Sequence, residues 1–399
     1  MLSLTCWRKS KSGCHEVSEK SLGARSLRVV CLCLISVSVP ATLRGQVSDA
    51  APSGVIVGDQ SLEIPFVIAA RGASAYLPEH TLEATVLAHA MRADYIGLGC
   101  VLTRDGVPVV LQDLILDNVS SVATDFPGRQ RENGLWYVMD FSLDELRTLS
   151  IHEPTAEGKT REQADSRFPQ GSSRFRISTL EEHVQLIQGL NRTTGRCAGL
   201  YLELRDPEAH LDQHLDLTAA VSTALRRSGY TRPDSPVFVQ CVSLAQLQRL
   251  RKPLFCPLPL VWQVSEPLSD NQLREASAVC DGIAVAFPAI IRDAPAAESK
   301  TTSFIERAHS RGLQVHVWNL PTTALPVQAE STDDGDLDRI CKAGVDGIFG
   351  EYPDRLVSWR DRQREAVPGA RPFRLLRRDG EIAPQQQRIS ERDDRRVLR

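Results

Sequence analysis

Short apolar runs alternate with longer amphipathic stretches from Pro65 onward, and this alternation limits the fold of the 399-residue chain more than any other feature. The apolar runs have the length and composition of buried strands, whereas the stretches between them have helical periodicity. Strands that alternate with helices predict a parallel sheet covered by helices. The runs that read as strands are 66–70, 95–98, 107–111, 200–204, 237–240, 260–263, 282–286, 315–318 and 347–349. The helix-like segments are 83–93, 179–190, 215–228, 244–250 and 337–343.

These runs number one more than a closed eight-stranded barrel needs. Asp105-Gly106 is a hairpin signal, so one of the strands beside it is expected to be accessory. We therefore predict an α/β fold, a distorted (β/α)8 barrel with one hairpin strand. An open, doubly wound parallel sheet is the alternative, because its strands and helices alternate in the same way.

The N-terminal region has the pattern of a targeting segment. Arg25 and Arg28 precede the apolar run 29–39, which predicts a secretory signal peptide or an N-terminal anchor within residues 1–48. The apolar run is too short for a stable membrane span. A secreted or periplasmic location is therefore expected.

The predicted domain occupies residues 62–360. Residues 361–399 are rich in arginine and lack apolar periodicity, which predicts a disordered tail. Within the domain, residues 151–176 are polar and rich in glycine, serine and arginine. This composition predicts a long loop insertion over one face of the barrel.

Charge and cysteine content exclude some classes of function. The formal net charge of −3 gives no reason to expect nucleic acid or an anionic membrane as a partner. The cysteines downstream of the N-terminal region are widely scattered and show no metal-ligand spacing, which favours buried thiols over a disulfide framework. They are Cys100, Cys197, Cys241, Cys256, Cys280 and Cys341.

The segment 70–84 resembles the first motif of the glycerophosphodiester phosphodiesterase family, which begins His-Arg-Gly-Ala and in the periplasmic branch continues in a similar way. Further blocks resemble that branch in the same order; they are 93–101, 109–113, 167–169, 189–191, 201–205, 315–318 and 347–354. The resemblance covers about residues 65–360. It implies a TIM-type barrel of the phospholipase-C-like phosphodiesterase fold, and hydrolysis of a glycerophosphodiester to glycerol 3-phosphate and an alcohol.

The resemblance also implies a set of catalytic groups. Two histidines exchange protons with the nucleophile and the leaving group. A Ca²⁺ or Mg²⁺ ion is held by a Glu-x-Asp pair and a glutamate on a later strand, since hard cations need several oxygen ligands. An arginine and a lysine hold the phosphate.

This sequence departs from the family pattern at most of these positions. Ala70 and Gln112 stand where the resemblance places the two histidines, and neither can exchange a proton at neutral pH. Gly97 and Gly99 stand in place of the two metal carboxylates. One remaining carboxylate is a poor calcium or magnesium site, so no cofactor is expected.

The phosphate-binding positions are retained. Arg71 matches the family arginine, Arg205 replaces its lysine with another cation, and Glu203 matches the third metal ligand. Other residues expected in the pocket are Glu79, His316 and Trp318. With one carboxylate beside two arginines, the predicted pocket has a formal charge of +1, and the glycines leave room for a bulkier anion or ordered water.

Three functions remain open on the sequence. The first is a pseudoenzyme that binds a phosphate-bearing molecule such as glycerol 3-phosphate or a glycerophosphodiester. The second is a weak or altered phosphodiester hydrolase that recruits replacement groups from the loop insertion, where His152, Glu153, Glu157 and Asp165 are available. The third is a non-catalytic scaffold with a vestigial pocket.

Overall fold

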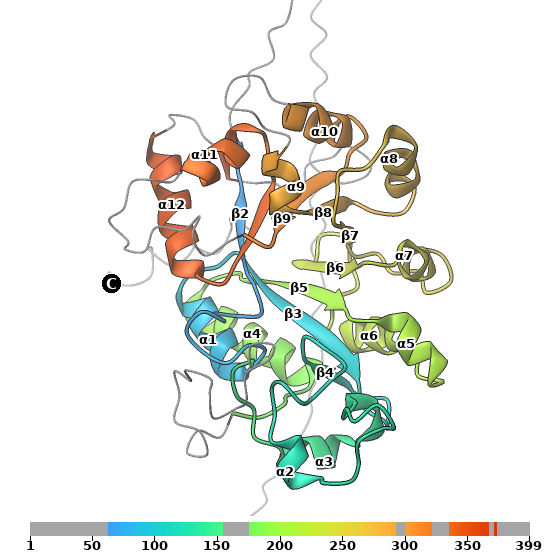
Figure 1. Cartoon of the computed structure of the whole chain (residues 1–399). Helices are drawn as coiled ribbons and strands as arrows, with labels where there is room; N and C mark the ends of the chain where they lie inside the picture. Colours follow the sequence, from blue (N-terminus) through green and yellow to red (C-terminus); the bar gives the residue numbers. More distant parts are fainter. Residues whose placement is uncertain (1–62, 155–174, 293–299, 321–334, 367–370, 373–399) are drawn as a thin grey trace, which may run out of the picture. The chain divides into compact units, whose positions relative to one another are not determined.

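Eight parallel strands close into a barrel in the computed structural model, which describes residues 63–154, 175–292, 300–320, 335–366 and 371–372 (Figure 1). Around the barrel, each strand pairs with the next in the order β2, β3, β5, β6, β7, β8, β9, β10, and β10 pairs with β2. The strands are β2 (Phe66–Ala69), β3 (Tyr95–Leu102), β5 (Gly199–Leu204), β6 (Val237–Cys241), β7 (Leu260–Val264), β8 (Gly282–Ala286), β9 (Gln314–Trp318) and β10 (Gly347–Gly350). The predicted closed barrel is confirmed, and the open sheet is excluded by the β10–β2 pairing.

The predicted hairpin strand is also confirmed. Strand β4 (Pro108–Val110) pairs antiparallel with β3 and lies outside the closed ring. Gly106 adopts φ 76° in the turn between the two strands, a conformation that glycine reaches at little cost.

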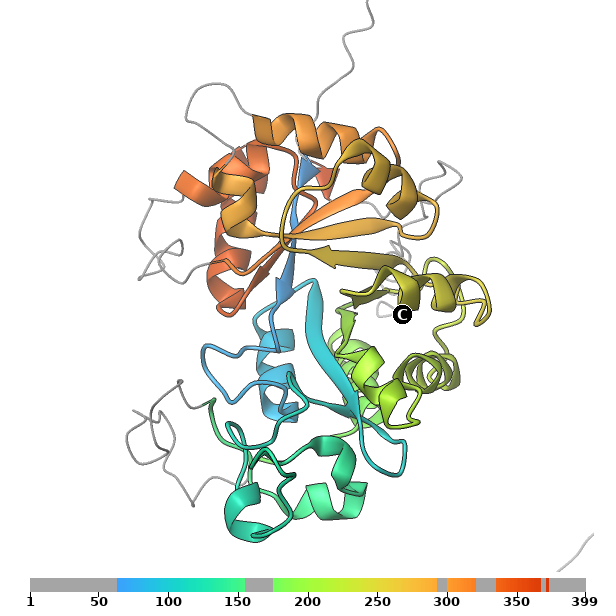
Figure 2. The ribbon, with the colours of Figure 1, turned by 45° about the vertical axis from the view of Figure 1, so that its right-hand side comes forward.

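Helices follow most strands and surround the barrel (Figures 1 and 2). Each of the five helix-like segments of the sequence is a helix, with ends that differ by a few residues. The helices are α1 (Leu82–Ala90), α2 (Val122–Asp125), α3 (Leu143–Thr148), α4 (Leu180–Thr194), α5 (Pro207–Asp212), α6 (Leu217–Arg227), α7 (Leu244–Arg251), α8 (Asp270–Ser277), α9 (Phe287–Arg292), α10 (Lys300–His309), α11 (Gly335–Lys342) and α12 (Pro353–Ala366), with a 3-10 turn at Val138–Asp140. Two short strands, β1 (Glu63–Ile64) and β11 (Arg371–Pro372), pair with each other.

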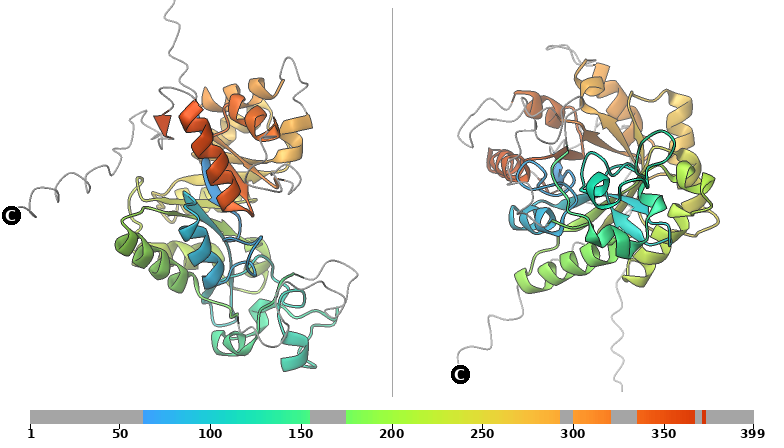
Figure 3. Two further views of the ribbon diagram at one scale, coloured as in Figure 1. Left: turned by 90° about the vertical axis from the view of Figure 1, so that its left-hand side faces the viewer. Right: turned by 60° about the horizontal axis from the view of Figure 1, so that its bottom comes forward.

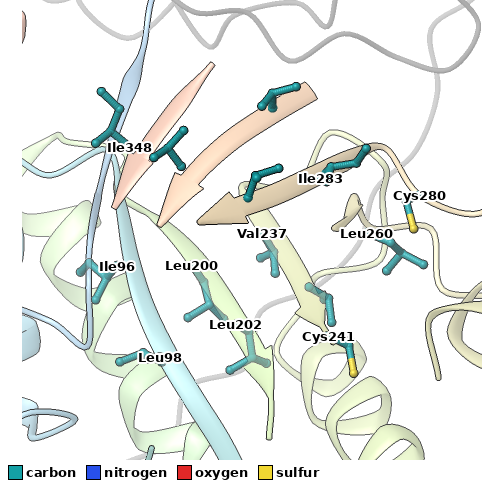
Figure 4. Close-up of a cluster of buried hydrophobic side chains, with 14 of the residues drawn as sticks. Ile96, Leu98, Leu200, Leu202, Val237, Cys241, Leu260, Cys280, Ile283 and Ile348 are labelled. Atoms are coloured by element: carbon teal, nitrogen blue, oxygen red, sulfur yellow. The ribbon is translucent and has the colours of Figure 1, made fainter. Parts of the chain in front are cut away.

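The hydrophobic core lies between the strands and the helices (Figure 4). Along β5, Leu200 and Leu202 belong to this outer core, while Tyr201 belongs to the cluster inside the barrel. Alternate side chains of a strand point to opposite faces, so Glu203 also points into the barrel. The same alternation places Gly97 and Gly99 of β3 on the inner face.

Three aspartates bind neighbouring strands together at their N-terminal ends. Asp94, Asp281 and Asp346 each immediately precede a strand and accept a hydrogen bond from the backbone N–H at the start of the strand beside it, at 2.7–2.8 Å. Asp281 also pairs with Arg251 at 2.6 Å, and both side chains are largely buried. Each aspartate therefore satisfies a backbone donor and fixes the register of one strand pair.

Replacing Asp281 by alanine should lower the free energy of unfolding by about 2 kcal/mol, because a charged hydrogen bond and an ion pair are lost together. The measurement is urea unfolding followed by circular dichroism. Asp212→Ala, at the exposed end of α5, is the matched control and should change the free energy by less than about 0.5 kcal/mol. Equal effects of the two substitutions would contradict this role of Asp281.

The predicted boundary at residue 360 is too early. Helix α12 continues to Ala366 and packs beside β2 (Figure 3). Arg360 is 3% exposed and pairs with Asp94 and Asp361, so the arginine-rich composition there reflects ion pairing within the fold. The predicted tail from residue 373, the N-terminal signal or anchor, and residues 155–174 of the predicted loop lie outside the described residues and stay predictions.

The described residues between β3 and α4, 103–154 and 175–179, form a lobe at one end of the barrel (Figure 3). Its core includes Val109, Val122, Phe141 and Leu149. Ile151 ties the described part of the predicted loop insertion to this lobe through bridges with Ser120 and Phe175.

The thiols fit the expectation of buried cysteines. Cys100, Cys241, Cys256 and Cys341 are free and buried; Cys280 is buried, and Cys197 is exposed. Among the residues that the structure describes, no helix combines the length and apolarity that crossing a bilayer requires.

Candidate functional site

A cavity of about 400 Å³ opens at the C-terminal ends of the barrel strands. This is the end at which barrels of this type carry their functional sites. Residues on or directly after β2, β3, β5, β6, β7, β9 and β10 contribute to it, from Ala70 after β2 to Glu351 after β10. The lining residues are Ala70, Arg71, His80, Gly97, Leu98, Gly99, Gln112, Tyr201, Glu203, Arg205, Gln240, Gln263, Trp318, Asn319, Leu320, Phe349, Gly350 and Glu351.

Arg71 is held on one side of the cavity by two carboxylates. It follows β2 with φ 55°, an uncommon conformation for a residue with a side chain. Its Nη1 lies 3.1 Å from Glu79 Oε2, and its Nη2 donates to Glu351. Burial raises the pKa of Glu79, and Arg71 opposes that shift. Glu79 thus lies behind Arg71 and positions it, and does not line the cavity.

Arg205 is held by three oxygen acceptors. Its Nη1 donates to Glu203 Oε1 at 2.6 Å, its Nε to the backbone oxygen of Gln112 at 2.6 Å, and its Nη2 to Asp113 Oδ1 at 3.4 Å. Burial raises the pKa of Glu203, while Arg205 favours its charged form. The guanidinium is therefore fixed in place at the β5 side of the cavity.

Both glycines of β3 line the cavity, but neither leaves open space. A Cβ atom on Gly99 would lie 2.6 Å from the backbone oxygen of Leu111, and one on Gly97 would lie 3.0 Å from that of Ala69. The expectation of room for a bulkier anion beside these glycines is wrong, because backbone carbonyls lie where the first side-chain atom would be.

Among the residues that the structure describes, no proton-transfer group takes over at Ala70 and Gln112, where the resemblance places the two histidines. Ala70 offers no polar side-chain atom, and the side chain of Gln112 accepts a hydrogen bond from His80 Nε2 at 3.0 Å. Burial lowers the pKa of His80 to about 3, so the imidazole is neutral at pH 7 and too weak a base for general catalysis. His80 positions Gln112 through this hydrogen bond.

His316 does not line the cavity, although the sequence placed it there. It is fully buried inside the barrel, where it accepts a hydrogen bond from the Tyr201 hydroxyl at 2.8 Å and bonds to Gln314 at 3.2 Å. It supports Tyr201, which does line the cavity. Trp318 lines the cavity as predicted, and its indole N–H donates to the backbone oxygens of Val264 and Ala284 at 3.2 Å.

Burial also lowers the pKa of His316, to about 4. In the unfolded chain His316 becomes protonated as the pH falls below about 6.5, whereas in the folded protein it stays neutral until the pH reaches about 4. His316 should therefore lower the free energy of unfolding as the pH falls from about 6.5 to about 4, by up to about 1.4 kcal/mol per pH unit.

His316→Gln should reduce the slope of unfolding free energy against pH between pH 6 and 4.5, because one proton fewer is taken up on unfolding. Urea unfolding at several pH values measures that slope. Parallel curves for the variant and the unaltered protein would show that His316 is protonated in the folded state as well.

Four residues of the predicted loop were considered as replacement catalysts, and the two that the structure describes do not reach the cavity. His152 bonds through its two ring nitrogens to the backbone oxygens of Glu153 and Ser120, at 2.8 and 3.1 Å. Neither His152 nor Glu153 lines the cavity. Glu157 and Asp165 lie outside the described residues.

The side chains present do not fit a calcium or magnesium ion. Glu203 is engaged with Arg205, and the inner face of β3 presents glycine where oxygen ligands would be needed. Among the described residues, no cluster of three or more histidine, cysteine or carboxylate side chains could hold a metal ion.

Several lining residues were not predicted as pocket residues from the sequence. Glu351 matters most, because its pairing with Arg71 changes the charge of the cavity. Among the described residues, two arginines and two carboxylates line it, so their formal charges cancel, and the predicted balance of +1, which left out Glu351, is wrong. Glu351 follows a predicted strand, and that position at a strand's C-terminal end was the available signal. The other lining residues without a predicted pocket role include His80, Tyr201, Gln240, Gln263 and Asn319.

Comparison with known proteins identifies the family. A model of the glycerophosphoryl diester phosphodiesterase family matches residues 71–355. A glycerophosphodiester phosphodiesterase of Haemophilus influenzae is 30% identical, over 73% of this chain and 89% of its own. One of Treponema pallidum is 38% identical, over 47% of this chain and 53% of its own.

The fold agrees with that match. The structure of an Oleispira antarctica phosphodiesterase in complex with its product sn-glycerol-3-phosphate has a TM-score of 0.54 and 21% identity, and the match covers 75% of this chain and 97% of that one. The family model spans more than half of this sequence, including Arg71, Glu203 and Arg205. The chain belongs to the glycerophosphoryl diester phosphodiesterase family.

Proposed function

We propose that this protein binds a phosphate-bearing small molecule, glycerol 3-phosphate or a glycerophosphodiester, and is catalytically impaired in the family reaction. The proposal rests on which side chains line the cavity. Arg71 and Arg205 line it, and so do Ala70 and Gln112, which stand where the resemblance places the proton-transfer groups.

The arginines favour an oxyanion ligand. Both guanidinium groups line the cavity and are held by carboxylates, so they are ordered before a ligand arrives. Planar guanidinium groups bind phosphate through paired hydrogen bonds. The product bound to the Oleispira antarctica relative is a molecule of this class.

Glu351 limits the affinity. Its carboxylate pairs with Arg71 and lies at the cavity wall, so an incoming phosphate competes with it. Affinity in the micromolar-to-millimolar range follows from a few charge-assisted contacts that replace existing ones.

Two other functions compete with this one. A weak hydrolase would need a replacement acid or base, and the described loop residues His152 and Glu153 bond elsewhere. A scaffold with a vestigial pocket would retain the fold without ligand binding.

Isothermal titration calorimetry of the full chain with glycerol 3-phosphate at low salt tests the proposal. We expect saturable binding in the presence of a chelator. No heat of binding at millimolar ligand would reject ligand binding and leave the scaffold function. A steady release of glycerol 3-phosphate from glycerophosphocholine by the same preparation would favour the hydrolase.

A further inference from the structure

Gly99 lies where the segment after β4 packs closely against β3 in the cavity wall. A Cβ atom there would lie 2.6 Å from the Leu111 oxygen and 3.3 Å from Cγ of Arg205. Real Cβ atoms do not approach an oxygen so closely, so a side chain would have to push the Leu111 backbone away. The Leu111 N–H in turn donates to the Gly99 oxygen at 3.1 Å. Glycine thus permits the segment after β4 to lie directly on β3.

This close approach determines what Arg205 can bind. The two residues after Leu111 supply two of its three acceptors: Gln112 through its backbone oxygen at 2.6 Å, and Asp113 through its carboxylate at 3.4 Å. Glu203, which is in register with Gly99 on the neighbouring strand, supplies the third at 2.6 Å. A guanidinium has five N–H groups, so these contacts leave two of them, one on each terminal nitrogen.

We propose that Gly99 is a positioning residue for a cation-independent oxyanion site, in which the packed Leu111–Asp113 segment orients Arg205 toward the ligand's phosphate. The inference rests on the proposed binding function and names its chemistry: a phosphomonoester or phosphodiester group bound by guanidinium donors. The glycine at this position is then part of a rebuilt site and more than a lost carboxylate.

The geometry explains why a cation is not needed. The Arg205 guanidinium already supplies the positive charge beside Glu203. A carboxylate introduced at residue 99 would meet the Leu111 oxygen before it could reach a ligand position. Restoring that carboxylate by itself should therefore disorder Arg205 and not create a metal site.

Gly97 provides the matched control. It lies on the same face of the same strand and lines the same cavity. Its Cβ would meet the Ala69 oxygen at 3.0 Å, a milder contact, and no Arg205 atom is among its nearest neighbours. Alanine at either position adds one methyl group to β3, but at residue 99 it presses on the segment that holds Arg205.

The first experiment is calorimetry of the full chain with glycerol 3-phosphate, once with EDTA present and once with about 5 mM CaCl₂. The unaltered protein should bind equally well in both. Gly99→Ala should weaken binding at least ~10-fold, and Gly97→Ala less than about 3-fold, because a misplaced guanidinium loses charge-assisted hydrogen bonds. Arg205→Lys should weaken binding by a similar factor, and Gly99→Ala should add little to it, since the compact ammonium of lysine cannot span the three acceptors that hold the planar guanidinium.

The second experiment needs no ligand. Hydrogen–deuterium exchange of the backbone around Leu111 reports the packing of this segment on β3. Exchange should be at least ~10-fold faster in Gly99→Ala than in Gly97→Ala, because the Leu111 N–H loses its acceptor.

The outcomes separate the two proposals. If the unaltered protein does not bind glycerol 3-phosphate, the proposed function fails. Hydrogen–deuterium exchange then still decides whether Gly99 holds the Leu111–Asp113 segment on β3. Binding that requires calcium would overturn the cation-independent site. Equal affinity and equal exchange in the two alanine variants would overturn the positioning role of Gly99.

Discussion

Glycerophosphodiesters should be hydrolysed by this protein at least ~10⁴-fold more slowly than by a family member that carries both histidines and the full carboxylate set. Each positioned acid or base contributes about 10²–10⁴-fold, and the metal ion adds to this. Here Ala70 and Gln112 stand where the resemblance places both proton-transfer groups, and His80, with its pKa lowered to about 3, cannot substitute for them. Millimolar calcium or magnesium should not raise the rate, because Glu203 is already paired with Arg205.

The measurement is release of glycerol 3-phosphate from glycerophosphocholine, with and without added metal. The variant with Ala70→His and Gln112→His controls for the proton-transfer groups and should recover less than about 10²-fold, since the metal carboxylates are still missing. Turnover by the unaltered chain within tenfold of a complete relative, in a preparation free of contaminating enzyme, would show that another catalytic group acts in the cavity.

Replacing Arg71 and Arg205 by alanine together should weaken glycerol 3-phosphate binding by at least ~100-fold. Each charged hydrogen-bonded contact contributes about 1.5–3 kcal/mol, and the two lie on neighbouring sides of one cavity. Calorimetry measures the change. Arg226→Ala with Arg227→Ala removes the same charge from the exposed end of α6 and is the control, which should bind like the unaltered protein.

Circular dichroism must show that the double variant is folded, because it leaves Glu79 and Glu203 without their arginines. Burial already raises the pKa of both carboxyls, so they can become protonated when the arginines are lost. Unchanged affinity in a folded double variant would place the ligand elsewhere, and an equal loss in the control would mean that long-range charge, and not the cavity, drives binding.

The sequence by itself determined the architecture. Strand runs such as 200–204 alternate residues of the outer core with residues of the barrel interior, and Asp105-Gly106 marks the turn to the strand outside the ring. These signals are local, because a strand's pattern records which faces are buried wherever it lies in the sheet. The motif at residues 70–84 likewise located Arg71 at the cavity without any knowledge of its neighbours.

The tertiary structure decided the character of the site. His316 shares a strand with Trp318 and points to the same face, yet only Trp318 reaches the cavity, because depth inside the barrel depends on the register between strands. Glu351 is 280 residues from Arg71 in the chain and neutralises it in space.

The two glycines of β3 show the same division. Their lack of a side chain is evident from the sequence, which says nothing about what fills the space beside them. At Gly99 that space is occupied by the backbone carbonyl of Leu111, from the segment after β4. Residue identity determines which groups are available, whereas distances between segments far apart in the chain determine which of those groups meet, and with them the charge and chemistry of the cavity.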